Sequence, residues 1–289
     1  MGADPALHEA AGVSAARPAR PRPRLRQDLR LAVIMAAVAA LATVAVFPYL
    51  LQVAPGRFDA VPAPLWVLIA IQALQMFVVV TLLAWAGLRM GHRIGMGSPL
   101  LQHWINGQAV PAMPRARPWH SALLGVGAAL AILLLSSVLD PWLLPPPRVE
   151  MQDIEGAGNA LYGLLASFYG GIVEELQLRL FLLTLVAWGL TWLVRRGRGF
   201  DGRVSPGVAW IAIGVAALLF GAGHLPTAAG IWGLDAGVIA RTVLLNAIGG
   251  VVFGWLYWKR GLEMAVLSHF AADIVLHVLV PLLLPRTIL

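Results

Sequence analysis

The chain has 289 residues, of which 59% are hydrophobic and only 12% are charged, and its formal net charge is +7. A water-soluble domain of this length needs a much larger charged surface, so the composition excludes a soluble globular protein and indicates a polytopic membrane protein. The absence of cysteine excludes disulfides and thiolate chemistry. Only Lys259 is a lysine among 21 basic residues, and such an arginine bias is typical of a GC-rich bacterial genome. We therefore expect an integral protein of a bacterial cell membrane.

The first 28 residues are polar, and arginine alternates with proline between Arg17 and Arg24. A segment of this composition cannot bury enough apolar surface to fold alone, so residues 1–28 are expected to form a disordered cytoplasmic arm. Basic residues in front of a first membrane span are the usual orientation signal. We therefore predict no nucleic-acid partner for this arm.

Seven apolar stretches follow, and each is long enough to cross about 30 Å of hydrocarbon at 1.5 Å per residue. The first is longer than the apolar part of a signal peptide, so we interpret it as a span. The sequence thus predicts an all-α membrane bundle of about seven transmembrane helices, at approximately Leu29–Gln52, Pro64–Leu88, Ser121–Leu144, Asn159–Val194, Gly207–Leu225, Gly237–Trp258 and Leu262–Leu284.

The distribution of basic residues predicts the orientation of the bundle. With seven crossings, sixteen of the 21 Lys and Arg residues fall on the side of the N-terminal arm and only three on the opposite side. Because Lys and Arg accumulate in cytoplasmic loops, this asymmetry places the N-terminus in the cytoplasm and the C-terminus outside.

The fourth apolar stretch is unusually long, because Asn159–Val194 would extend about 54 Å as one straight helix. Gly170 and Gly171 mark a place where this helix can bend, break or be closely approached. If the stretch divides into two spans, the count becomes eight and the C-terminus returns to the cytoplasm.

A short polar run interrupts this same stretch and contains Glu174, Glu175 and Arg179. Each such group at a helix centre costs about 2.5–3.5 kcal/mol when unpaired, so ionisable residues here indicate a functional site. Glu175 and Arg179 are four residues apart and share one helical face, where they can form an ion pair. Glu174 points about 100° away, which leaves it as the carboxylate available to take a proton from water. The structural alternative is an ion pair that only locks two helices together.

Candidate partners occur in two later spans. His224 follows Phe220 and two glycines at the expected end of the fifth span, where a single histidine is commonly an interfacial residue. The seventh span carries His269 and Asp273 four residues apart, with His277 one turn further on. Such a pair is able to hydrogen-bond, to bind a metal or to form a helix contact. In the sixth span, a stripe of small residues at four-residue spacing favours tight helix packing over chemistry, and it comprises Asn246, Gly250 and Gly254.

Taken in order, three motifs resemble those of the CPBP or Abi family of intramembrane endopeptidases, which includes the type II CAAX prenyl endopeptidases. They are EExxxR at Glu174, FxxxH at Phe220 and HxxxD at His269. The resemblance covers residues 156–285, which it identifies as a catalytic core, and residues 29–145 supply additional N-terminal helices. It implies a water activated by Glu174 and His224, an oxyanion stabilised by His269 and Asp273, and supporting roles for Glu175 and Arg179.

Two positions depart from the family pattern. Leu180 replaces a frequent glycine, and Asp273 stands where eukaryotic members have asparagine. An ionised Asp cannot donate to an oxyanion, so Asp273 must be protonated, orient His269 or bind a metal. We expect no resident cofactor, although a zinc ion bound by His224, His269 and carboxylates is an alternative that suits the residue types.

We therefore predict an intramembrane endopeptidase whose partners are the lipid bilayer and a membrane-associated protein or peptide substrate. Two alternatives stay open, a catalytically silent scaffold or immunity protein and a proton-coupled carrier. The prediction requires Glu174, His224, His269 and Asp273 to converge in one wet chamber. Counted from the basic loops, however, His224 lies about 27 Å into its span and His269 about 14 Å into its own. The spans must then be tilted or broken, or their boundaries must differ from those predicted.

Overall fold

The computed structural model describes residues 25–56, 58, 61–108, 117–148, 157–195 and 202–283. These residues form helices and connecting turns, without a strand among them. Within the described residues, seven helical segments are long and apolar enough to cross a membrane, so the predicted all-α bundle of seven spans is confirmed and the protein is an integral membrane protein. The spans are Leu25–Val53, Leu65–Ile94, Pro118–Leu143, Ala157–Val194, Pro206–Trp232, Ala236–Arg260 and Leu262–Leu283. Most of the arm predicted at residues 1–28 lies outside the described residues.

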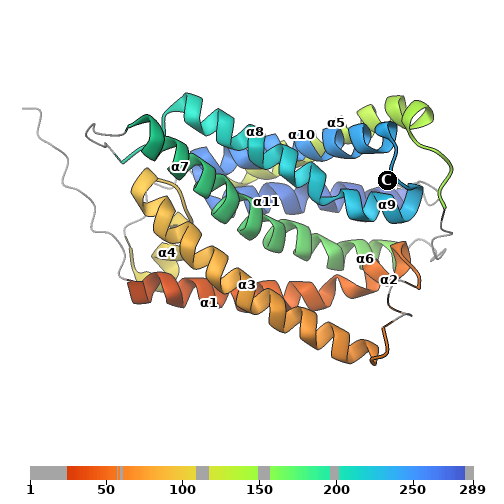
Figure 1. The fold of residues 1–289 in the computed structure, drawn as a ribbon, viewed down its shortest axis with the longest axis horizontal. Helices are drawn as coiled ribbons and strands as arrows, with labels where there is room; N and C mark the ends of the chain where they lie inside the picture. The colour runs from red at the N-terminus through yellow and green to blue at the C-terminus, as the bar shows by residue number, and fades with distance from the viewer. Residues whose placement is uncertain are drawn as a thin grey trace, which may run out of the picture.

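The long helices run side by side along the longest axis of the molecule (Figure 1). The first span comprises α1 (Leu25–Ala45) and the short α2 (Phe47–Val53), and α1 packs along α3 (Leu65–Ile94). The buried face of α1 is mostly alanine, which lets the two backbones approach closely in a lipid environment where apolar burial alone gives little attraction.

The other half of the bundle is built on α10 (Ala236–Arg260), which packs against α5 (Pro118–Leu143) and α8 (Pro206–Gly223). Gly250 is a point of close approach to α8, because a Cβ there would lie 2.8 Å from the Cα of Ala217. The packing role predicted for Gly250 from its spacing is therefore confirmed. A single residue, Gly261, joins α10 to α11 (Leu262–Asp273), which continues as η5 (Ile274–Leu279) and α12 (Val280–Leu283).

The fourth span remains one continuous helical segment between these halves. It begins as α6 (Ala157–Phe168) and ends as α7 (Thr184–Val194), and its middle is π-helical in η3 (Tyr169–Glu174) and η4 (Leu176–Leu183). The glycine pair, where the helix was expected to bend, break or be closely approached, leaves the span unbroken, and within the described residues the alternative of eight spans does not occur. Single π-turns of this kind are frequent at functional sites, because they shift the side chains that follow to another face.

The fifth span corrects the predicted boundary at Leu225. The helix pauses at His224 and then continues as α9 (Leu225–Trp232), so His224 lies inside the span and not at its membrane edge. Pro226 falls in the first turn of α9, where a backbone N–H would have no acceptor within the helix, so the N–H that proline lacks is not missed. A proline after two glycines ordinarily ends a helix, so the predicted boundary at Leu225 came too early in the chain.

Polar clusters hold the ends of the bundle together. Asp28 of α1 is fully buried and accepts hydrogen bonds from Arg89 (3.0 Å) and Gln102 (2.9 Å), the latter on α4 (Pro99–Asn106). At the other end, Arg241 of α10 forms two 2.9 Å bonds to the carboxylate of Asp140 on α5. Both clusters satisfy a charge at a helix contact, which fixes how the helices sit relative to one another.

Candidate functional site

The buried centre of the site is the carboxylate of Glu175, which is 0% exposed. Its Oε1 lies 2.8 Å from Arg179 Nη1, so the ion pair expected from the four-residue spacing is present. The same oxygen lies 2.8 Å from His269 Nδ1. Because an ionised carboxylate only accepts hydrogen bonds, the proton of this contact belongs to Nδ1. Glu175 thereby fixes the orientation of His269 and turns its other ring nitrogen, Nε2, toward the interior of the bundle.

Arg179 is almost as deeply buried as its partner, with 1% exposure. Its guanidinium lies over the rings of Phe220 (4.7 Å) and Phe253 (5.3 Å), and aromatic faces attract cations. Phe253 also stacks on the ring of His269 at 4.4 Å. Charge pairing and aromatic packing together make Glu175, Arg179 and His269 one rigid unit that joins the fourth, fifth, sixth and seventh spans.

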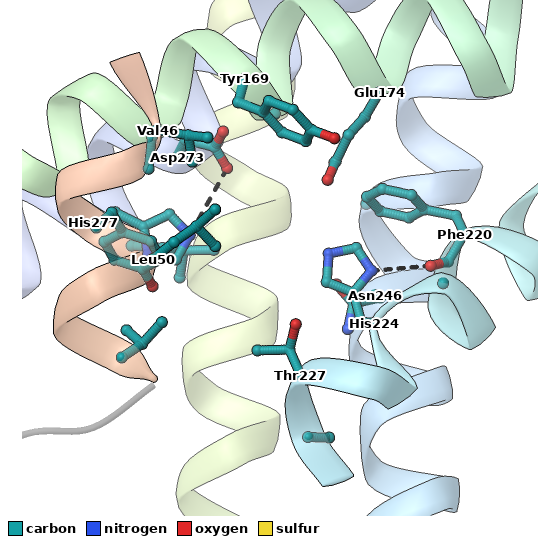
Figure 2. Close-up of a pocket in the computed structure, with 18 of the residues that line it drawn as sticks. Val46, Leu50, Tyr169, Glu174, Phe220, His224, Thr227, Asn246, Asp273 and His277 are labelled. Atoms are coloured by element: carbon teal, nitrogen blue, oxygen red, sulfur yellow. Dashed lines mark hydrogen bonds and ion pairs between the residues drawn. The ribbon is translucent and has the colours of Figure 1, made fainter. Parts of the chain in front are cut away.

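Glu174 is arranged differently, although it is the next residue before Glu175. It ends η3 and its side chain is 21% exposed, facing a cavity of about 730 Å³. Its closest charged contact is His269 Nε2 at 3.8 Å, which is too long for a hydrogen bond. Figure 2 shows Glu174 and Tyr169 pointing into this cavity from the same helix. Glu174 is thus the carboxylate that bound water can reach.

His224 approaches the cavity from the junction of α8 and α9. Its Nδ1 lies 2.9 Å from the carbonyl oxygen of Phe220, one turn earlier. A carbonyl only accepts, so Nδ1 carries the proton, and the unprotonated Nε2 is left to accept a hydrogen bond from a molecule in the cavity. In Figure 2 the His224 ring lies across the cavity from Glu174.

Asp273 completes the set from the end of α11. Its Oδ1 is 3.6 Å from His269 Nε2, and its residue exposure is only 7%. Gly170 makes this proximity possible, because a Cβ there would collide with Asp273 Oδ2 and lie 3.3 Å from His269 Nε2. The glycine pair in the fourth span therefore serves as a close-approach point for the seventh.

The structure brings all four predicted cavity residues to the same chamber. Glu174, His224, His269 and Asp273 line it, while Glu175 and Arg179 support it from behind. Although their estimated depths differ, His224 and His269 both lie against the ring of Phe220, with ring centroids 4.8 Å and 5.7 Å away. A volume of about 730 Å³ is within the range of small-ligand and peptide side-chain sites.

Several lining residues were not among the predicted site residues, and they are Tyr49, Tyr169, Asn246 and His277. Asn246 was assigned to a packing stripe, but its side chain faces the cavity and donates to the Thr242 carbonyl at 2.8 Å. An amide in the middle of an apolar span is itself a signal, because it needs a polar partner. His277 was visible from its four-residue spacing to Asp273, whereas nothing in the sequence pointed to Tyr49.

A metal centre was the alternative raised by the same residue types. Within the described ranges, no group of three or more His, Asp and Glu side chains is placed so that it could hold a metal ion. His269 Nδ1 is already bonded to Glu175, which leaves one ring nitrogen of His269 facing the chamber.

Residues 156–275 match the family model described as "Type II CAAX prenyl endopeptidase Rce1-like", and this range contains all six predicted site residues. No curated protein and no solved structure matches the chain.

Proposed function

We propose that this protein is an intramembrane endopeptidase that hydrolyses a peptide bond of a membrane-associated protein or peptide, because residues 156–275 match the model of the Rce1-like type II CAAX prenyl endopeptidase family. The observation that supports this most directly is the shared chamber, into which three spans direct the imidazoles of His224 and His269 and the carboxyl groups of Glu174 and Asp273. The match supplies the class of reaction, and the geometry supplies a role for each side chain.

In the proposed mechanism, a water molecule lies between Glu174 and His224. One of its protons is hydrogen-bonded to the Glu174 carboxylate and the other to His224 Nε2, whose tautomer is set by the bond from Nδ1 to Phe220. Glu174 takes the first proton as the water oxygen attacks the substrate carbonyl. Glu174 is suited to this step because its neighbour Glu175, and not Glu174 itself, neutralises the nearby guanidinium of Arg179.

The attack produces a tetrahedral intermediate with a negatively charged oxygen. His269 is held by Glu175 with Nε2 facing the chamber, and a protonated Nε2 donates to this oxyanion. Removal from bulk water strengthens each such hydrogen bond, and the donor needs no reorientation during the reaction because Phe253 and Glu175 already fix the ring. Glu174 then returns its proton to the amine that leaves when the C–N bond breaks.

The test is cleavage of a peptide library by the purified protein in detergent micelles, compared with Glu174→Gln. We expect the variant to lose at least a hundredfold in kcat, since a positioned general base contributes about 10²–10⁴-fold. His103→Gln is the matched control, because the exposed His103 on α4 bonds to the backbone carbonyl of Gln108 and does not line the chamber.

The possible outcomes distinguish the proposed mechanism from a scaffold, a carrier and a metalloprotease. Full cleavage by Glu174→Gln would refute the mechanism, and absence of cleavage by the wild type would favour a scaffold or carrier. Loss of wild-type cleavage on addition of a chelator would instead identify a metalloprotease.

A further inference from the structure

His277 is a second imidazole in the chamber wall that the proposed mechanism does not use. It lies two turns after His269 on the seventh span, and its Nε2 is 4.0 Å from Asp273 Oδ1. The same oxygen is 3.6 Å from His269 Nε2. One carboxylate oxygen therefore stands between two imidazole rings. His277 also lies beyond residues 156–275, so the family match does not include it.

The position of His277 is closely determined by its neighbours. A Cβ at Gly163 would collide with the backbone carbonyl of His277, so α6 and η5 are in direct backbone contact here. The ring of Tyr49 meets the His277 ring edge-on, with 5.7 Å between centroids. The His277 side chain is 29% exposed toward the chamber. Figure 2 shows it beside Asp273, on the wall formed with α2.

The position of His277 beside Asp273 matters because the chamber is rich in carboxyl groups. Three carboxyl groups (Glu174, Glu175 and Asp273) lie around His269, and the guanidinium of Arg179 is already paired with Glu175. An ionised Asp273 would repel the developing oxyanion and compete with it for the Nε2 proton of His269. The other titratable groups lining this part of the chamber are Tyr49 on α2, Tyr169 and Glu174 on η3, and His224 between α8 and α9. Within 4.0 Å of Asp273, the described residues offer two imidazoles, and His269 is already bound to Glu175.

We propose that Asp273 and His277 share one proton. His277 is then a positioning residue, because it keeps the Asp273 carboxyl group uncharged where that group faces the reacting carbonyl. Two interacting groups of this kind titrate as a pair. With the proton on the carboxyl group, Asp273 becomes a hydrogen-bond donor, as an asparagine amide would be at this position. No bond to carbon is made or broken in this step. Because 4.0 Å is longer than a direct hydrogen bond, the proton passes between Oδ1 and Nε2 through one bridging water molecule. The inference rests on the proposed peptidase function for its catalytic consequence.

The kinetic test is a double-mutant cycle with His277→Gln and Asp273→Asn. Asp273→Asn changes the rate by itself, so the informative quantity is the further effect of His277→Gln in each background. With Asp273 present, we expect His277→Gln to lower kcat about tenfold or more with little change in KM, because the oxyanion forms after binding. In the Asp273→Asn background no shared proton is needed, so the same change should then alter kcat less than about twofold. His103→Gln again serves as the matched control.

Ring-nitrogen NMR of ¹⁵N-histidine-labelled protein tests the shared proton without any cleavage. The titration of His277 should move in Asp273→Asn, while that of His120 in the same sample stays where it is. His277→Asn supplies a second variant if His277→Gln does not fold. Equal kinetic effects of His277→Gln in both backgrounds, or an unchanged His277 titration in Asp273→Asn, would overturn the inference. If the wild type cleaves nothing, the proposed function fails, but the NMR comparison still decides whether the two groups share a proton.

Discussion

Replacing either of two adjacent carboxylates of the fourth span, Glu174 or Glu175, by glutamine should cost very different amounts of stability. Glu175 is 0% exposed and its Oε1 contacts both Arg179 Nη1 and His269 Nδ1 at 2.8 Å. Glu175→Gln preserves the shape of the side chain but leaves the Arg179 charge buried without its counter-charge. Breaking a buried ion pair in this way costs about 3–5 kcal/mol.

We expect the lower end of this range, about 3 kcal/mol, because the glutamine carbonyl still accepts a hydrogen bond from His269. That value lowers the ratio of folded to unfolded protein roughly a hundredfold, which is a large part of a typical unfolding free energy of about 5–15 kcal/mol. Glu174→Gln should cost less than about 1 kcal/mol, because its side chain is 21% exposed and has no charged contact nearer than 3.8 Å.

The assay is unfolding by SDS in mixed micelles, followed by the fluorescence of the 11 tryptophans. The double variant Glu175→Gln/Arg179→Met removes both charges, so it should be less destabilised than the sum of the two single variants. Equal SDS midpoints for Glu175→Gln and the wild type would refute the reasoning, and so would strict additivity in the double variant.

Two further predictions concern the helix contacts and the orientation. Gly163→Ala should destabilise the fold by about 1–3 kcal/mol, because its Cβ would meet the His277 carbonyl. In the control Gly127→Ala, the new Cβ would have no heavy atom within 4 Å, so this variant should be neutral. SDS unfolding of both variants checks this, and equal midpoints would contradict the close contact. The charge asymmetry predicts that the α9–α10 connection lies outside the cell. Leu234→Cys in the cysteine-free chain should then react with an impermeant maleimide in intact cells, while His103→Cys should react only after lysis. The reverse labelling pattern would show that the bundle is inserted the other way.

The sequence was sufficient for features that depend on local spacing. A span needs about 20 consecutive apolar residues, so the seven spans were predictable from composition alone. The pairing of Glu175 with Arg179 was also predictable, because residues four apart share a helical face. The separation of the neighbouring Glu174 from that pair follows from the same geometry.

Other features depended on contacts between distant segments. The continuation of the fifth span past Pro226 placed His224 inside the bundle, although a proline after glycines ordinarily marks an end. Tyr49 joined the chamber because α2 bends against the seventh span, and neither its type nor its spacing indicated this. Asn246 faces the chamber because of the rotation of α10, which the stripe of small residues did not specify.

The sequence by itself determined that this protein crosses a membrane as a helical bundle, and which of its polar residues are too costly there to lack a partner. It also determined the Glu175–Arg179 pair, because that interaction lies within one helix. Only the tertiary structure decided which residues share the chamber with Glu174 and which imidazoles surround Asp273. The physical reason is that these choices depend on helix rotation and axial offset, and both are set by close contacts at glycines, such as Gly163 against the His277 carbonyl and Gly170 against the Asp273 side chain.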